Sequence, residues 1–375
     1  MHIYVARPGD SPYSVARRFM TDVEALCELN QLRDPTRLTA GLGLAIPGGE
    51  AGTAGMEVAA CVFPNADGES LLESLPYLSY LCPFSCAVSA AGELSAPPEK
   101  WLEAAGEQAA AVLLTVTNIA EGGVFSGDAA HALFTEETAQ DAFFEALLPA
   151  LAAGGYYGAC LSFQYVYPYD REAYNRFLRR AADTLHDRGY FLVTAVTPSS
   201  GDGRQGMPEQ AHDYAVHGQC ADRVALMTYD WGYSYSKPQA VSPVNRIRPV
   251  LDYAVKQIPA GRILMGLSCG GCDWSLPWRQ GLAARPLSAA AAANLAVSVG
   301  AEVRYDAQAQ APYFDYSDAA GIRHQVWYED VRSIRARLAL AREYGLAGVG
   351  IWTVNRLCRP LLAALGDACQ VEKVM

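Results

Sequence analysis

Two polar side chains, Ser162 and Gln164, lie in a mainly apolar stretch that runs from Gly155 to Pro168. Its alternation predicts a buried strand that leads into an aromatic loop, and residues two apart on a strand point to the same face. Many barrel enzymes keep carboxylates at such a position. A primary amide has no proton of suitable acidity to donate, so this pair predicts hydrogen bonding rather than acid catalysis.

Aromatic and polar side chains also follow other apolar runs, in the stretches MTYDWGY, GLSCGGCDW and GIWTVN. Aromatic faces paired with a few polar groups suit a sugar ring, because its C–H faces stack while its hydroxyls bond in the plane. Any single tryptophan could equally be a core residue, but several aromatic strand ends together favour a ligand surface. The residues that we expect to share this surface are Gln164, Tyr229, Asp230, Trp231, Trp274 and Trp352.

Eight apolar runs separated by helical patterns predict an α/β fold, a (β/α)8 TIM barrel, in which strand ends and the loops after them form the pocket. We assign the barrel to residues 57–367, with an insertion at about 275–328. Alternation and a DAAG turn in that insertion predict an added α+β unit with a β-hairpin over the barrel mouth. The expected strands span residues 58–63, 77–82, 111–117, 159–165, 190–196, 224–230, 263–268 and 348–353.

The first 48 residues show a strand–helix–helix–strand pattern that predicts a small separate domain. Residues 49–56, which are rich in glycine and lack a large apolar anchor until Met56, predict a flexible linker. The sequence also begins in a strand-like pattern, without the basic and apolar regions of a signal peptide. We therefore expect cytoplasmic synthesis without conventional secretion.

Charge and hydropathy exclude two classes of partner. The net charge of -11 and the scattered Lys and Arg residues argue against nucleic acid. No apolar run approaches the roughly 18 residues that a membrane span needs. A neutral ligand fits better.

The ten cysteines include two closely spaced pairs, Cys82 with Cys86 and Cys269 with Cys272. Such spacing could serve zinc, but no His lies nearby and structural zinc sites usually have a second pair. The simpler interpretation is free thiols in a reducing compartment. We expect no metal and no other cofactor.

The N-terminal unit resembles the LysM carbohydrate-binding module in PGDSPYSVARRF, ALCELNQL and LGLAIPG, which fall in order at the right spacing. This resemblance implies binding of N-acetylglucosamine polymers, peptidoglycan or chitin, in a shallow groove. Gly9 and Asp10 could also simply turn and cap the first helix. The implied groove residues are Gly9, Asp10, Ser11, Pro12 and Tyr13, with Ile46 and Pro47 opposite.

The barrel resembles glycoside hydrolase family 18, especially its spore-cortex-lytic branch, in which LysM modules precede such a barrel. The matching stretches include PYLSYLCPFSCAV, MTYDWGYSYSKPQAVSPV and GLAGVGIWTVN. Members of that branch cleave bonds next to N-acetylglucosamine in peptidoglycan. The resemblance implies a spore or cell-wall association, and it implies that Tyr229 would bond the acetamido carbonyl while Trp352 forms the floor.

Family 18 chemistry is substrate-assisted: a Glu protonates the leaving oxygen, and an Asp two residues earlier steadies the acetamido group that attacks the anomeric carbon. Aligned with this motif, YGACLSFQ places Tyr157 at the first Asp, Ser162 at the second Asp and Gln164 at the acid Glu. All three acidic positions are replaced. The resemblance therefore implies a sugar-binding relative that has lost hydrolysis.

Two other functions stay open. The chain could be a working hydrolase that uses a displaced acid, either Asp230 or a carboxylate of the insertion. It could instead be a structural coat or scaffold protein whose sugar site is vestigial, in which case neither domain would bind glycan.

Overall fold

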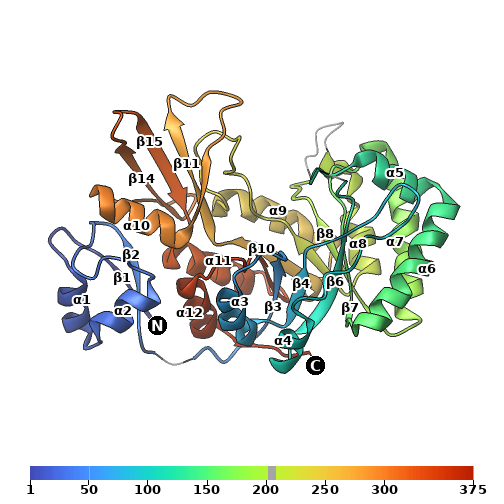
Figure 1. Cartoon of the computed structure of the whole chain (residues 1–375), viewed down its shortest axis with the longest axis horizontal. Helices are drawn as coiled ribbons and strands as arrows, with labels where there is room; N and C mark the ends of the chain where they lie inside the picture. The colour runs from blue at the N-terminus through green and yellow to red at the C-terminus, as the bar shows by residue number, and fades with distance from the viewer. Residues whose placement is uncertain (50, 121, 202–207, 375) are drawn as a thin grey trace.

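The structure is a computed structural model that describes residues 1–49, 51–120, 122–201 and 208–374. Its centre is a closed barrel of parallel strands, because β16 pairs with both β10 and the first barrel strand, β3 (Figure 1). All eight runs predicted from the sequence form barrel strands, which confirms the TIM-barrel prediction. In chain order the strands are β3 (Gly55–Val62), β4 (Tyr80–Pro83), β6 (Ala111–Thr117), β7 (Gly158–Ser162), β8 (Phe191–Val196), β9 (Arg223–Leu226), β10 (Ile263–Ser268) and β16 (Gly348–Trp352).

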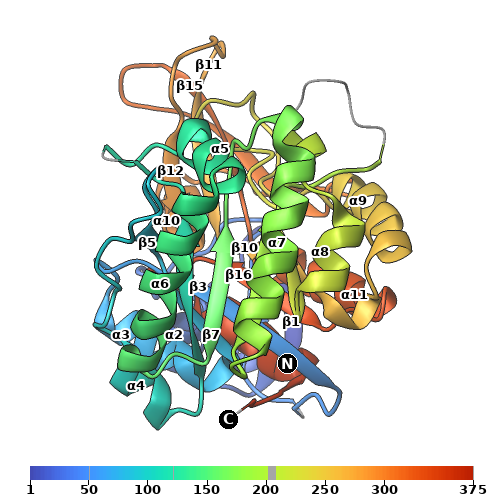
Figure 2. The same ribbon diagram turned by 90° about the vertical axis from the view of Figure 1, so that its right-hand side faces the viewer.

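Helices surround this barrel and cover its outer face: in Figure 2, α6 and α7 lie on either side of β7, and α8 follows next to α7. In α11 the side chains of Val331, Ile334, Leu338 and Ala341 are buried, which confirms the apolar stripe expected from their spacing. The helices are α3 (Gly68–Ser74), α4 (Leu102–Glu107), α5 (Gly127–Thr135), α6 (Glu137–Gly154), α7 (Arg171–His186), α8 (Tyr214–Cys220), α9 (Val244–Gln257), α11 (Val331–Glu343) and α12 (Arg359–Ala368).

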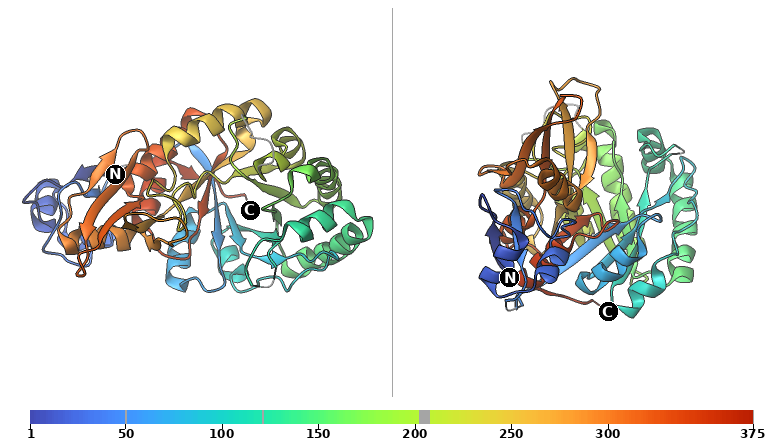
Figure 3. Two further views of the ribbon diagram at one scale, coloured as in Figure 1. Left: turned by 90° about the horizontal axis from the view of Figure 1, so that it is seen from above. Right: turned by 60° about the vertical axis from the view of Figure 1, so that its left-hand side comes forward.

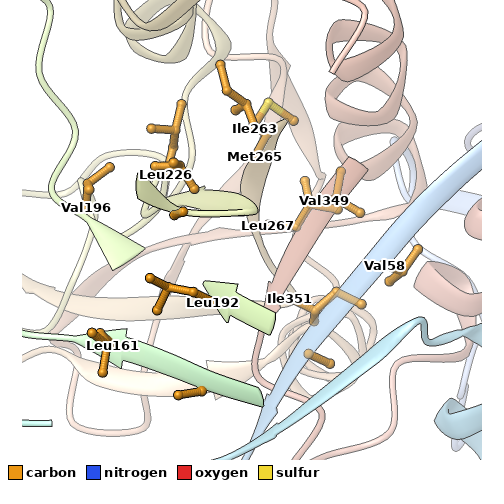
Figure 4. Close-up of a cluster of buried hydrophobic side chains, with 14 of the residues drawn as sticks. Val58, Leu161, Leu192, Val196, Leu226, Ile263, Met265, Leu267, Val349 and Ile351 are labelled. Atoms are coloured by element: carbon orange, nitrogen blue, oxygen red, sulfur yellow. The ribbon is translucent and has the colours of Figure 1, made fainter. Parts of the chain in front are cut away.

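Alternate residues of each strand pack on opposite sides of the barrel wall. Leu161 and Leu192 belong to the core shared with the helices (Figure 4), whereas Cys160 and Val193 belong to the core inside the barrel. This alternation follows from the two-residue period of a strand. It decides which side chains can reach a ligand inside the barrel.

Aromatic rings fill the barrel at the amino ends of its strands. The ring of Phe191 stacks on Tyr80 at 5.4 Å and lies 5.4 Å from the ring of Tyr157. Beside them, the guanidinium of Arg223 donates to the carboxylate of Glu57 at 2.6 Å. Tyr157 therefore packs at the end of the barrel opposite its mouth.

The insertion between β10 and α11 is a five-stranded antiparallel sheet with one helix, and it rises above the barrel (Figure 1). The β14–β15 hairpin carries the predicted turn, where Asp318 accepts hydrogen bonds from the backbone of Ala320 and Ile322. The sheet is larger than the predicted hairpin and begins at Gly270. Its elements are β11 (Gly270–Leu276), β12 (Arg285–Ser288), α10 (Ala289–Val299), β13 (Arg304–Asp306), β14 (Ala311–Ser317) and β15 (Arg323–Tyr328).

The N-terminal unit has the predicted strand–helix–helix–strand order: β1 (His2–Val5), α1 (Pro12–Phe19), α2 (Val23–Leu29) and β2 (Gly43–Ile46). Ser11 caps α1 and forms a capping box with Ser14. β1 and β2 pair antiparallel, with His2 opposite Ile46 and Val5 opposite Gly43. The unit is therefore a helical pair packed on a two-stranded ribbon.

This unit shares a hydrophobic core with the inserted sheet. Leu44 and Val15 pack in one cluster with Phe314 and Val326 of that sheet. The contact also includes a backbone hydrogen bond of 2.9 Å from the amide of Val303 to the carbonyl of Ala40. Both views in Figure 3 show the N-terminal ribbon against the insertion.

The flexibility predicted for the linker at residues 49–56 stays a prediction, although the N-terminal unit packs against the insertion. Within residues 49–56, residue 50 lies outside the described residues, and β3 already begins at Gly55. Gly52 also donates a backbone hydrogen bond of 3.0 Å to Gly366. Local composition cannot reveal apolar contacts made by residues that lie 250 positions apart. No helix in the described part of the chain has the length and apolar character of a membrane span.

Candidate functional site

A cavity of about 830 Å³ opens at the carboxyl ends of the barrel strands. Each of the eight strands contributes to its wall, and so do the loops that follow them. Its volume falls within the usual range for small-molecule sites. Of the residues predicted to form the site, the structure brings five together here: Ser162, Gln164, Tyr229, Asp230 and Trp352.

Ser162 and Gln164 both face this cavity, although β7 ends at Ser162. Asn118 fixes the backbone of Gln164, because its side chain accepts from the Gln164 amide at 3.0 Å and donates to the Gln164 carbonyl at 2.7 Å. The side-chain amide of Gln164 lies 3.6 Å from the sulfur of Met227. Since a thioether is a weak acceptor, a ligand oxygen could replace it.

Tyr229 and Trp352 form an aromatic surface in the cavity. Their rings are stacked, with centroids 6.0 Å apart and planes at 12°. The edges of Phe63 and Phe84 contact Trp352, at 5.5 and 5.1 Å between centroids. Burial raises the pKa of Tyr229 well above its usual value, so its hydroxyl stays protonated and can donate a hydrogen bond.

Asp230 is the one carboxylate among the described residues that line the cavity. Burial raises its pKa to about 6, so near neutral pH it exists partly in the protonated form. Its backbone adopts a left-handed conformation, with φ of 63°, which is uncommon for a residue with a side chain. A carboxyl group that combines this backbone conformation with a raised pKa, and that lines a cavity, indicates a functional position.

Three predicted residues lie elsewhere. Tyr157 packs between Tyr80 and Phe191 at the closed end of the barrel. Trp231 packs against the core between barrel and helices. Trp274 is only 1% exposed within the inserted sheet, where its indole N–H donates to the carbonyl of Ser236 at 2.7 Å. The placement of Trp231 and Trp274 at the barrel mouth was wrong, because the insertion begins before Trp274 and because aromatic type alone does not distinguish core from surface. The alignment of Tyr157 with the first Asp of the motif stays a prediction.

The predicted groove of the N-terminal unit is only partly consistent with the register of its ribbon. Ile46 pairs with His2, at the end of the ribbon away from Gly9, and it is 1% exposed. Ile46 and Pro47 therefore cannot lie opposite the β1–α1 turn. Within that turn Asp10 accepts from the hydroxyl of Tyr4 at 2.6 Å, and Tyr13 is 64% exposed. Gly9, Asp10 and Ser11 of the turn, with Pro12 and Tyr13 at the start of α1, stay a proposed glycan contact, although Pro12 is buried.

The close cysteine pairs of the sequence are not the pairs that meet in the structure. Cys82 contacts Cys61 and Cys160 in the cavity wall, and these thiols together with burial raise the pKa of Cys82. Cys269 contacts Cys358 rather than Cys272. All ten cysteines are free thiols. Within the described ranges no group of three or more His, Cys, Asp or Glu side chains is arranged to hold a metal ion.

Sequence reasoning missed several cavity residues that follow the barrel strands directly or lie in the loops after them. Phe63 and Phe84 support Trp352, while Phe125, Tyr165 and Tyr233 lie at the rim. Their common signal is position, because each comes shortly after the carboxyl end of a strand. A search of all eight strand ends for aromatic residues would have found them.

Comparisons with known proteins agree with this geometry. Residues 118–356 match the model of the glycosyl hydrolases family 18, and residues 4–47 match the LysM domain. The chain is 40% identical over 285 residues to a cortical fragment-lytic enzyme of Bacillus subtilis (strain 168), covering 76% of this chain and 66% of that protein, slightly less than two thirds of its length.

Two solved structures are similar over nearly the whole chain. The spore cortex-lytic enzyme SleL of Bacillus megaterium QM B1551 has a TM-score of 0.93 at 27% identity, covering 100% of this chain and 99% of that one. The Bacillus cereus enzyme SleL has a TM-score of 0.82 at 33% identity, covering 99% and 87%. The chain belongs to glycosyl hydrolase family 18 and carries a LysM domain ahead of its barrel.

Proposed function

We propose that the chain binds a glycan containing N-acetylglucosamine in the barrel cavity and does not hydrolyse it efficiently. The observation that carries this proposal is the composition of the cavity. Its lining includes Tyr229, Asp230 and Trp352, which we propose face the sugar, and Gln164, which the family resemblance aligns with the catalytic acid. The names of the cortex-lytic relatives favour peptidoglycan as the ligand and the spore as its location.

The reason for weak or absent hydrolysis is chemical. Gln164 can donate a hydrogen bond to a glycosidic oxygen, but it cannot transfer a proton to the leaving group. Ser162 provides no negative charge near the acetamido group, so it cannot stabilise a cationic intermediate. Both residues can still hydrogen-bond a sugar in its ground state. This combination favours binding over turnover.

We expect Trp352→Ala to lower the affinity for N-acetylglucosamine oligomers by about tenfold or more, because a buried aromatic surface of this size often dominates binding. Isothermal titration calorimetry with a soluble oligomer measures the loss. The matched control is Trp101→Ala, since Trp101 is also half-buried but lies outside the cavity. Equal losses in both variants, or none in Trp352→Ala, would argue against a sugar site on this surface.

A second candidate function, slow hydrolysis with Asp230 as the acid, is favoured by the raised pKa of this residue. An acid must be protonated, and that form is lost as pH rises through about 6. We therefore expect any turnover to be highest below pH 6, to fall about tenfold per pH unit well above it, and to vanish in Asp230→Asn. Turnover that survives Asp230→Asn would place the chemistry elsewhere, for example in the insertion.

The third possibility, a scaffold protein with a vestigial site, predicts a different result. In that case neither the cavity nor the LysM turn would bind any oligomer. Calorimetry on the wild-type chain with chitin-type and peptidoglycan-type fragments distinguishes this outcome from the first two. It also distinguishes the two glycan classes from each other.

A further inference from the structure

We propose that three tyrosines, Tyr165 at the cavity rim and Tyr167 and Tyr169 outside the cavity, form a shelf that binds the continuation of a glycan chain beyond the cavity. The shelf belongs to the loop between β7 and α7. This inference rests on the proposed function and adds a place where a longer ligand leaves the barrel. The ligand class is a neutral polysaccharide strand of at least several sugar units.

The shelf is continuous with the cavity. Tyr165 lines the cavity and is also 64% exposed, so one ring contributes to both surfaces. Phe125, another cavity residue, lies beside it with 6.2 Å between ring centroids. A chain seated on Trp352 would therefore meet Tyr165 where it leaves the barrel.

The outer rings of the shelf are held in place. Tyr167 and Tyr169 stack with centroids 5.1 Å apart, and the hydroxyl of Tyr167 donates to Asp128 at 2.8 Å. The ring of Tyr167 also lies over Gly127, where an added Cβ would come within 2.9 Å of it. Such fixed rings bind with a small loss of side-chain freedom, which favours recognition.

Tyr169 is fixed from its other side as well. Its ring meets the ring of His131 edge to face at 5.8 Å, and Nδ1 of His131 lies 2.7 Å from the buried carboxylate of Asp170. Despite these contacts Tyr169 stays 72% exposed. A large aromatic side chain that is ordered yet exposed suits stacking against a sugar face.

Packing does not explain this exposure. Val166, between two of the tyrosines, is buried and anchors the loop on the barrel core. Tyr165 adopts a left-handed backbone conformation, with φ of 53°, which presents its ring at the rim instead of in the core. Such a conformation is costly for a residue with a side chain, and it occurs most often at functional sites.

The charges beside the shelf restrict the ligand. Two acidic residues, Asp128 and Asp170, lie next to the tyrosine rings. Asp170 is 2% exposed and paired with His131, so Asp128 is the charge that would repel an anionic polysaccharide, whereas neutral hydroxyl and acetamido groups could donate hydrogen bonds to it. The shelf therefore fits a neutral N-acetylated chain better than an acidic one.

The test compares affinity for short and long N-acetylglucosamine oligomers in the full chain. Tyr169 does not line the cavity, so Tyr169→Ala should leave affinity for a disaccharide unchanged within about twofold. It should lower affinity for a hexasaccharide by about tenfold. Tyr169→Phe, the matched control, keeps the ring face and should bind both oligomers like the wild type. Thermal unfolding of each variant checks that the fold is intact.

Three results would overturn the shelf. Affinity of the wild type that does not rise with oligomer length would do so, as would equal losses for short and long oligomers in Tyr169→Ala. No loss for the hexasaccharide would also exclude it. Failure of the wild type to bind even the disaccharide would instead contradict the proposed function, and the shelf with it.

Discussion

Combining Gln164→Glu with Ser162→Asp should produce measurable hydrolysis of an aryl glycoside of an N-acetylglucosamine oligomer. Both side chains already face the cavity, and Asn118 holds the backbone of residue 164 in place. The new Glu supplies the missing acid, and the new Asp supplies charge beside the acetamido group. We expect the rate to rise about 10² to 10⁴-fold above the wild-type chain, measured by release of the aryl group.

Each single substitution should do little, because the two groups act as a unit and such effects are strongly non-additive. The matched control is Gln164→Ala with Ser162→Asp, which has the new charge but no acid. A third change, Tyr157→Asp, follows from the sequence motif but not from the structure. Tyr157 packs against Phe191 at the closed end of the barrel, far from the groups that would react. If the double variant folds and binds sugar but shows no turnover, the cavity has been reshaped beyond the motif.

Gly41→Ala should destabilise the chain by about 2–4 kcal/mol and loosen the LysM domain from the inserted sheet. Gly41 has a φ of +81°, and an added Cβ would overlap the carbonyl of Val303, which lies in the insertion directly before β13. Chemical denaturation measures the free energy of unfolding. Hydrogen exchange should show faster exchange at the amide of Val303, which bonds to Ala40.

Gly9→Ala is the control for this prediction. Gly9 has a similar φ of +86°, but nothing lies within 4 Å of an added Cβ. It therefore carries the same backbone strain without a collision at the domain contact. If Gly9→Ala costs as much stability as Gly41→Ala, the contact between LysM domain and insertion contributes nothing measurable.

The barrel could be predicted from the sequence because its signals are local. Each strand is a short apolar run bounded by polar or helical segments, and the strand ends then place Gln164, Tyr229 and Trp352 at one mouth. The same reasoning located Ser162. These predictions were reliable because all strands of a closed parallel barrel run in the same direction, so their carboxyl ends lie together at one end of the barrel.

The errors arose where long-range packing decides. The sequence suggests that Trp274 lies at the end of a barrel strand. It belongs instead to the inserted sheet, whose first strand along the chain, β11, is hard to recognise because it begins with two glycines. Ile46 looks like a groove residue, yet the ribbon register places it beside His2. The docking of the LysM domain depends on contacts with residues near 300, and no pattern within the first 50 residues contains that information.

The core shared by the LysM domain and the insertion has a consequence for polymer recognition. Because the two parts share a hydrophobic core, we expect the direction from the exposed ring of Tyr13 to the barrel mouth to be set before any ligand binds. If both sites bind glycan as proposed, this arrangement favours glycan chains whose curvature matches it, whereas a tethered module would adapt to any glycan chain. The protein could thus distinguish a stiff, straight polysaccharide from a bent or cross-linked mesh made of the same sugars, by mechanics rather than by chemical identity.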